Sequence, residues 1–188
     1  MEKSAVIIGG GLGGLFTGAI LSKEGVKVTV IEKNPTVGGG LQSFRRFGET
    51  FDTGMHVIGG MQEGGNIRRI CEYLGIFDKV HVMDVDPDVI DTLYFAEDKK
   101  VYKIAQGKEG FVNALSESFP DQKDNLRAYV DAVYAIVDEL DMFYLRPSQD
   151  FIFVHSEDFM MSADGFIAKY ISDRKLCSVL AYMNPLYG

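Results

Sequence analysis

The sequence lacks an excess of basic residues. It carries 19 Lys and Arg against 27 Asp and Glu, which gives a formal net charge of −8. Proteins that bind nucleic acid through its phosphates usually present a basic patch or stripe, and no such stripe is visible here. The acid excess also argues against attachment to anionic lipid by charge alone. Nucleic acid is therefore not an expected partner.

Cysteine is scarce as well. Cys71 and Cys177 are the two cysteines, and they lie far apart in apolar, helix-like sequence. No short cysteine spacing, metal-ligand pattern or Ser-His-Asp arrangement is present, so the sequence predicts neither a metal site nor a nucleophilic triad. Two isolated thiols indicate packing roles in a reducing compartment, and we expect a cytoplasmic protein.

A clear membrane span is also missing. Residues 5–21 carry no charge and place small residues at Gly14 and Gly18, a pattern found in membrane helices. The stretch is at the short limit for a span, and six of its residues are glycine, which disfavours an isolated helix. Glu2 and Lys3 cancel in charge and no cleavage pattern follows, so a secretory signal is not expected.

Residues 5–32 are the most informative part of the chain. A short apolar run is followed by GGGLGG at residues 9–14, an apolar segment to Leu21, and a second apolar run that ends at Glu32. This order predicts a strand, a glycine turn, a helix, and a parallel strand with an acid at its end. Since the helix N-terminus would face phosphates and the acid can accept ribose hydroxyls, the stretch predicts a dinucleotide-binding site.

Three glycines of this turn have separate expected roles. Gly9 permits the tight turn, Gly11 lets the main chain approach a pyrophosphate, and Gly14 lets the helix pack closely on the sheet. Glu32 follows about twenty residues later, where a carboxylate suits the adenosine ribose. The strand, the turn, the helix and the acid therefore all indicate a dinucleotide-binding site.

The rest of the chain has a different pattern. Its predicted elements are an extended piece at 50–52, a helix at 66–74 ended by Gly75, a β-hairpin at 92–104, helices at 111–119 and 126–140, and two helices capped by Ser162 and Asp173. The many Tyr, Phe and Met side chains of this region favour core packing, with an apolar pocket as the alternative. We expect an α/β chain: a Rossmann-like βαβ unit with a glycine-rich loop over residues 1–65, then a partial α+β substrate region over 66–188.

Two further motifs follow Glu32. Glycines occupy residues 38–40, and residues 51–59 have the sequence FDTGMHVIG. With these motifs the chain resembles the flavin-dependent phytoene desaturase, carotenoid isomerase and retinol saturase group, which has an acid at the strand end, a glycine pair six residues later and then a Phe-Asp-x-Gly segment. The FDTGMHVIG segment is most similar to the saturase and isomerase branch. The likeness is specific over residues 5–60.

The resemblance implies FAD as the nucleotide. It also implies an oxidoreductase that desaturates, saturates or isomerises C–C double bonds of an apolar polyene or isoprenoid-like substrate, with an electron donor or acceptor as a further partner. Lys33 would lie near the adenine side, Gly38 and Gly39 near the phosphates, and residues 52–56 near the flavin ring. The expected cofactor-binding residues are Gly9, Gly11, Leu12, Gly13, Gly14, Glu32, Lys33, Gly38, Gly39, Gly40, Met55 and His56.

Within the flavin-proximal segment, His56 is the side chain that would change charge near neutral pH, so it is a candidate either for direct chemistry or for a structural role. Asp52 is a candidate flavin neighbour or an ordinary turn cap. The chain departs from the family at Gly40, where many relatives have Arg. Arg45 or Arg46 could supply the missing contact.

The chain also departs from the family in length, because its members usually continue well past this point and add a second flavin-contacting segment. We therefore expect an N-terminal portion, truncated at Gly188, that alone binds FAD weakly or not at all and shows no turnover. An exposed, unfinished sheet edge and a cut apolar interface should favour its self-association. Peripheral membrane contact through the missing chain is a further expectation. A flavin amine oxidase-like enzyme and a nucleotide-binding module without activity remain the alternatives.

Overall fold

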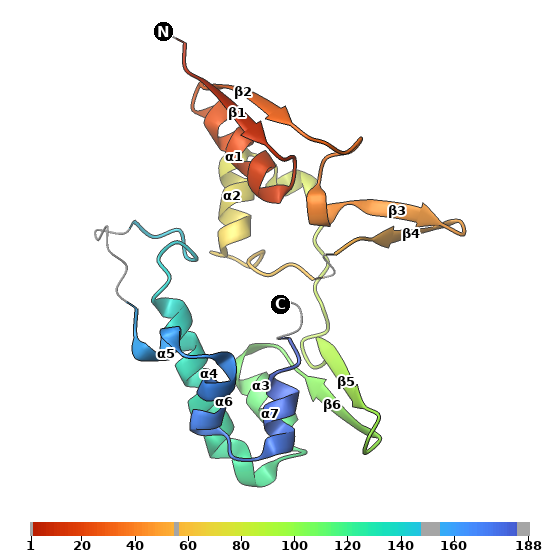
Figure 1. The fold of residues 1–188 in the computed structure, drawn as a ribbon, viewed down its shortest axis with the longest axis vertical. Coiled ribbons are helices and arrows are strands. Elements are labelled where there is room, and N and C mark those ends of the chain that lie inside the picture. Colours follow the sequence, from red (N-terminus) through yellow and green to blue (C-terminus); the bar gives the residue numbers. More distant parts are fainter. Residues whose placement is uncertain (1, 55–56, 148–154, 184–188) are drawn as a thin grey trace. The chain divides into compact units, whose positions relative to one another are not determined.

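The computed structural model describes residues 2–54, 57–147 and 155–183 (Figure 1). The chain divides into two compact units, Met1–Val82 and Met83–Gly188. The sequence pattern placed a boundary near residue 65, whereas the first compact unit extends to Val82. The reason is that helix α2 (Asn66–Leu74) packs on helix α1 (Leu12–Lys23) within the first unit.

The first unit begins with the predicted strand–helix–strand. Strand β1 (Ser4–Ile8) pairs in parallel with β2 (Lys27–Ile31), and α1 connects them. The pairing runs in register from Ser4 opposite Lys27 to Ile8 opposite Ile31. This geometry confirms the α/β interpretation of the sequence.

Helix α1 covers one face of this sheet. Gly18 is buried there, and a Cβ added to it would lie 3.3–3.5 Å from side-chain atoms of Ile7, Val28 and Val30. The opposite face is open, with Val6 65% and Ile8 88% exposed. Side chains alternate between the two faces of a strand, so the same residues that give β1 its apolar run leave half of that run facing outward.

A hairpin and a second helix complete the first unit. Strands β3 (Ser43–Arg46) and β4 (Glu49–Asp52) pair antiparallel, and a short 3₁₀ turn, η1 (Gly39–Leu41), precedes them. The sequence predicted the extended piece at β4 but not its partner β3. Helix α2 ends at Gly75, which has φ 70° and ψ 33°, the left-handed conformation predicted for this glycine.

The second unit is a hairpin packed with helices (Figure 1). Its elements are β5 (Asp91–Phe95), β6 (Lys100–Ile104), α3 (Gly107–Ser116), η3 (Pro120–Gln122), α4 (Lys123–Asp138), α5 (Glu157–Met160), α6 (Ala163–Tyr170) and α7 (Arg174–Leu180). The predicted hairpin and the helices at α3 and α4 are confirmed. So are the caps, because the Ser162 and Asp173 side chains accept hydrogen bonds from the Gly165 and Leu176 N–H groups.

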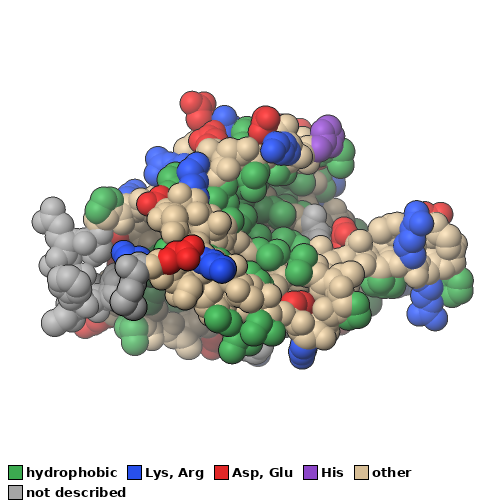
Figure 2. Space-filling model, turned by 90° about the horizontal axis from the view of Figure 1, so that it is seen from above, with side chains coloured by type: hydrophobic (Ala, Val, Ile, Leu, Met, Phe, Trp, Pro, Cys, Tyr) green, Lys and Arg blue, Asp and Glu red, His purple; other side chains and the backbone are tan. Residues whose placement is uncertain are grey.

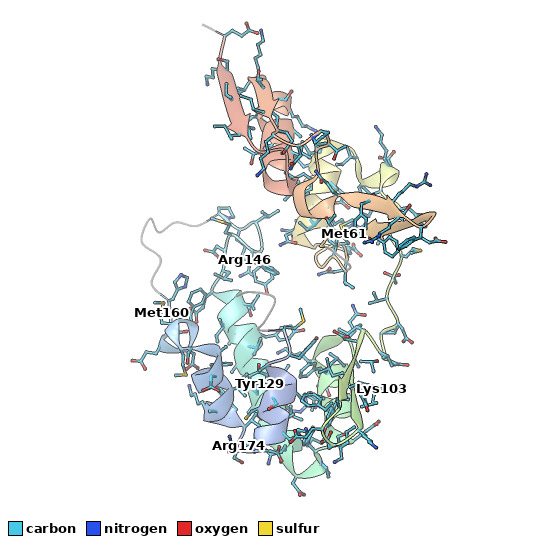
Figure 3. The ribbon with its side chains drawn as sticks, turned by 45° about the vertical axis from the view of Figure 1, so that its right-hand side comes forward. Met61, Lys103, Tyr129, Arg146, Met160 and Arg174 are labelled. Carbon is cyan, nitrogen blue, oxygen red and sulfur yellow. The ribbon has the colours of Figure 1, made fainter. Side chains whose placement is uncertain are left out.

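Apolar side chains from all of the larger elements form the core of the second unit. Tyr102 of β6 is 2% exposed and stacks on Phe119, with 5.4 Å between ring centroids. Tyr129 of α4, labelled in Figure 3, lies 5.7 Å from the Phe166 ring and 6.3 Å from the Tyr170 ring of α6. Burial raises the pKa of Tyr129. These aromatic side chains pack against one another, as the core-packing interpretation of the sequence expects.

Truncating a core side chain of the second unit will destabilise it. Leu126 of α4 is 0% exposed, so Leu126→Ala should lower the free energy of unfolding by about 2–5 kcal/mol through lost burial and a residual cavity. Urea unfolding followed by circular dichroism measures this change. Met142→Ala removes a side chain that is 78% exposed and is the control, with an expected change within about 0.5 kcal/mol. Equal effects of the two substitutions would contradict the assignment of the core.

Candidate dinucleotide-binding site

The glycine turn joins β1 directly to α1. Gly9 has φ 103°, a backbone conformation that side chains rarely adopt, and α1 already begins at Leu12. The sequence predicted a turn over residues 9–14, but Gly13 and Gly14 lie in the first turn of the helix. Three residues suffice to reverse the chain, so the turn itself is confined to residues 9–11.

The N-terminus of α1 can receive an anion. Gly11 precedes the helix in an extended conformation, and it provides no side-chain cap for the first N–H groups. The first turn also carries no acidic residue. Unpaired N–H groups and the helix dipole together favour a negatively charged group such as a phosphate at this position.

Gly14 sets how closely the helix approaches the strand that precedes it. A Cβ at Gly14 would lie 2.1 Å from the carbonyl oxygen of Gly9, which is far inside van der Waals contact. The atom it would meet belongs to the backbone and cannot rotate away. Only glycine therefore fits at this position, as the fingerprint interpretation requires.

Glu32 lies against the glycine turn. It follows the last residue of β2, and its Oε2 accepts a hydrogen bond from the Gly10 N–H at 2.7 Å. Its Oε1 accepts one from the Asn34 N–H at 2.8 Å. The bonds from Asn34 and Gly10 lower the pKa of this carboxyl, so it is ionised at neutral pH. An ionised carboxylate has further lone pairs, which can accept the hydroxyls of a ribose.

The second glycine segment lies directly on the first. The Gly38 N–H donates to the Gly10 carbonyl at 2.7 Å, and Gly38 forms an isolated parallel bridge with Gly11. Gly38 has φ 122° and Gly39 has φ 57°. A Cβ at Gly39 would lie 3.1 Å from the Gly11 Cα, so a side chain there would crowd the turn. The two segments meet main chain to main chain.

The chain after β4 contacts the glycine loop that contains Gly38 and Gly39. The Thr53 hydroxyl donates to the carbonyl oxygens of Gly40 at 3.3 Å and Gln42 at 2.9 Å. A Cβ at Gly54 would lie 3.4 Å from the Gly40 carbonyl oxygen. The start of the FDTG segment therefore borders the glycine loop, whereas Met55 and His56 lie outside the described residues.

The structure brings together most of the predicted set. Leu12 is the first residue of α1, Gly13 is exposed in its first turn, and exposed Lys33 follows Glu32. Arg45 and Arg46 interact within the hairpin: Arg45 Nε lies 3.5 Å from Thr50 Oγ1, and the Arg46 guanidinium lies 4.9 Å from the Phe47 ring centroid.

Sequence reasoning missed the role of Gly10. Its N–H donates to Glu32 and its carbonyl accepts from Gly38, so the backbone of a single residue links three segments. A Cβ at Gly10 would lie 3.1 Å from the Val37 side chain and 3.2 Å from the Glu32 carboxylate. The run of three glycines at residues 9–11 was the signal that could have indicated this role, because the turn alone does not need a third consecutive glycine.

Other kinds of site find no support in the described part of the chain. Across residues 2–54, 57–147 and 155–183, no group of three or more His, Cys, Asp or Glu could hold a metal ion. In the same ranges no helix is long and apolar enough to cross a bilayer. A groove between α1 and α2 is lined by Leu15, Phe16, Ala19, Ser22, Lys23, Leu74 and Ile76, none of them in the predicted set.

Comparison with known proteins agrees with this geometry. Residues 7–74 match the NAD(P)-binding Rossmann-like domain. The chain is 35% identical over 137 residues to an all-trans-retinol 13,14-reductase of Macaca fascicularis, covering 72% of this chain and 22% of that protein. It is 26% identical over 193 residues to a prolycopene isomerase of an Oncidium hybrid cultivar, covering 95% and 32%. The resemblance to the carotenoid isomerase and retinol saturase group is confirmed.

A solved structure supports the fold. A crystal structure of the PF1083 protein from Pyrococcus furiosus superimposes with a TM-score of 0.51 at 21% identity, covering 92% of this chain and 34% of that one. The chain thus spans between 22% and 32% of the two curated relatives above and about a third of the solved one.

The backbone contact at Gly14 gives a direct test. We expect Gly14→Ala to destabilise the first unit by about 1–3 kcal/mol, because the new methyl group collides with the Gly9 carbonyl. Gly13→Ala is the matched control: nothing lies within 4 Å of its Cβ position, and alanine favours a helix by up to about 1 kcal/mol. Thermal unfolding followed by circular dichroism measures both. A neutral Gly14→Ala would show that helix and turn do not approach as described.

Proposed function

We propose that this chain supplies the FAD-binding N-terminal portion of an oxidoreductase that acts on C–C double bonds of an apolar polyene or isoprenoid-like substrate. The observation that carries the proposal is the meeting of the uncapped α1 N-terminus, the ionised Glu32 carboxylate and the Gly38–Gly39 backbone at one turn. Each offers the partner that one part of an adenine dinucleotide needs.

The residues fit such a dinucleotide by shape as well as by charge. At Gly9, Gly11 and Gly13 the space that a Cβ would occupy is open or only lightly contacted, so a ligand can reach the main chain. The first N–H groups of α1 would hold the pyrophosphate. Glu32 would accept the ribose hydroxyls while keeping its bonds to Gly10 and Asn34, which fix its orientation. Lys33 would lie at the adenine side.

The choice of FAD over a nicotinamide dinucleotide is supported by the FDTGMHVIG resemblance, since the turn and the acid would serve either ligand. When bound, a flavin supplies hydride and electron transfer. The protein would position the substrate and exclude water, and residues 52–56, including His56, are candidates for the flavin-proximal wall. The resemblance implies Arg at the position of Gly40 in many members of the group, and Gly40 brings no such side chain to a phosphate or flavin contact.

The substrate class is supported by the names of the relatives, a retinol reductase and a prolycopene isomerase, both of which act on polyenes. Saturation would need an electron donor and desaturation an acceptor. We propose that turnover also needs the parts of these longer proteins that this chain does not span, so the 188 residues alone should not retain stoichiometric FAD.

The proposal is tested on the protein encoded by the complete reading frame. Its visible absorption spectrum should show bound flavin, and incubation with all-trans-retinol or prolycopene and a reductant should change the polyene spectrum. Bound flavin with turnover of amines instead would refute the substrate class. A colourless protein that binds a nicotinamide dinucleotide would refute the cofactor. The 188-residue chain, passed over a gel filtration column with excess FAD, should elute without stoichiometric flavin.

Glu32 provides the sharpest substitution. In the complete protein, Glu32→Ala should weaken FAD binding by about 1–3 kcal/mol, because charged acceptors for the ribose hydroxyls are lost. Fluorescence titration of the apoprotein measures the affinity. Glu63→Gln, at an exposed glutamate outside the predicted set, is the control and should leave the affinity unchanged. Unchanged affinity in Glu32→Ala would remove Glu32 from the site.

A further inference from the structure

The β3–β4 hairpin projects from the first unit. All eight strand residues, Ser43–Arg46 and Glu49–Asp52, are exposed. Figure 2 shows this hairpin as a narrow projection, with Lys or Arg, Asp or Glu, and hydrophobic side chains near its end. The cross-strand pair of Phe44 and Phe51 stacks with 5.4 Å between ring centroids, which stiffens the projection behind its tip.

The tip places a large apolar side chain in solvent. Phe47 is 87% exposed, and it has φ 55° while the following Gly48 has φ 85°. Two successive residues with positive φ are typical of type I′ hairpin turns, in which Asn-Gly is strongly preferred. A bulky residue at the first of these positions is strained and gains nothing from burial within the described chain. Strain of this kind points to a function for the side chain.

Two arginines at the end of β3 precede Phe47. Arg45 and Arg46 are consecutive in β3, so their side chains point to opposite faces of the hairpin. The Arg46 guanidinium lies 4.9 Å from the Phe47 ring centroid. Glu49 lies opposite Arg46 in the strand register, so residues 45–49 carry a formal net charge of +1, and Asp52 at the far end of β4 is the second acid of the hairpin. The positive charge is therefore local to the tip, in a chain whose net charge is −8.

We propose that the β3–β4 tip is a membrane-contact element that inserts Phe47 into the interface of anionic phospholipid. The ring would lie at the boundary of headgroups and acyl chains, and Arg45 and Arg46 would pair with lipid phosphates. A fluid interface can bury a single projecting side chain without a complementary surface. A stable protein partner would need about 800 Å² on each side, which so narrow a tip does not offer.

This element needs neither bound nucleotide nor turnover. It would attach the protein to a bilayer through residues of this chain. The net charge of −8 disfavours attachment by the charge of the whole surface, but a local positive tip can still contact lipid phosphates. Its failure would leave the proposed function untouched, and failure of the proposed function would leave it standing.

The test uses the full 188-residue chain and cosedimentation with vesicles of phosphatidylcholine, with and without phosphatidylserine. The chain should bind the phosphatidylserine vesicles more tightly, and salt should weaken the binding. Phe47→Asn should lower the partition coefficient about tenfold, because the inserted ring is lost. The same substitution should raise the thermal unfolding temperature, because Asn-Gly suits the turn. A side chain retained for folding would give the opposite change in stability.

Charge variants separate the phosphate contacts from the apolar one. Arg45→Gln and Arg46→Gln should each reduce binding to phosphatidylserine vesicles about fivefold and bring it toward the value for phosphatidylcholine alone. Glu49→Gln should strengthen it. Tyr94→Thr removes an aromatic side chain that is 62% exposed on the other hairpin and is the matched control, with no expected change.

Three outcomes would overturn the proposal. The first is no binding of the chain to either vesicle. The second is an unchanged partition coefficient in Phe47→Asn. The third is a result in which Phe47→Asn lowers the particle mass measured by light scattering but leaves vesicle binding unchanged. The tip would then be a contact between copies of the protein.

Discussion

The first unit depends on two backbone hydrogen bonds of Gly10. Its N–H donates to Glu32 at the end of β2, and its carbonyl accepts from Gly38 in the glycine loop. These two bonds connect the turn, the second strand and the loop, which are separated along the chain. Gly14 and Gly39 also meet backbone atoms, 2.1 Å and 3.1 Å from their Cβ positions, so main chain approaches main chain too closely for a side chain at these two glycines.

A site built mainly from backbone groups recognises the part that all adenine dinucleotides share. Backbone N–H groups and one carboxylate suit phosphates and ribose hydroxyls, which every adenine dinucleotide carries. They cannot distinguish a flavin from a nicotinamide, nor a polyene from an amine. We therefore expect the choice of redox group to depend on residues around the ring, and the family resemblance implies residues 52–56 for that position.

The two units use their apolar residues differently. In the second unit, apolar side chains of the hairpin and helices close around one core, with Leu126 and Leu176 0% exposed. In the first unit, α1 covers a single face of a two-stranded sheet and leaves Ile8 88% exposed on the other. Apolar surface of this extent at a sheet normally meets another structural layer. The first unit thus has the features of a nucleotide-binding edge whose second face remains available for packing.

The sequence by itself determined the local elements and the type of site. Short apolar runs located β1 and β2, two strand-like runs around a polar turn located the second hairpin, and an apolar repeat at three and four located α4. Gly75, Ser162 and Asp173 marked helix ends by their own chemistry. Strand β3 was missed, because its Ser-Phe-Arg-Arg sequence is largely polar and gains its conformation from pairing with β4. Only the tertiary structure showed that Gly10 joins Glu32 to the Gly38 loop, since these contacts link residues 22 and 28 positions apart and no local pattern encodes them.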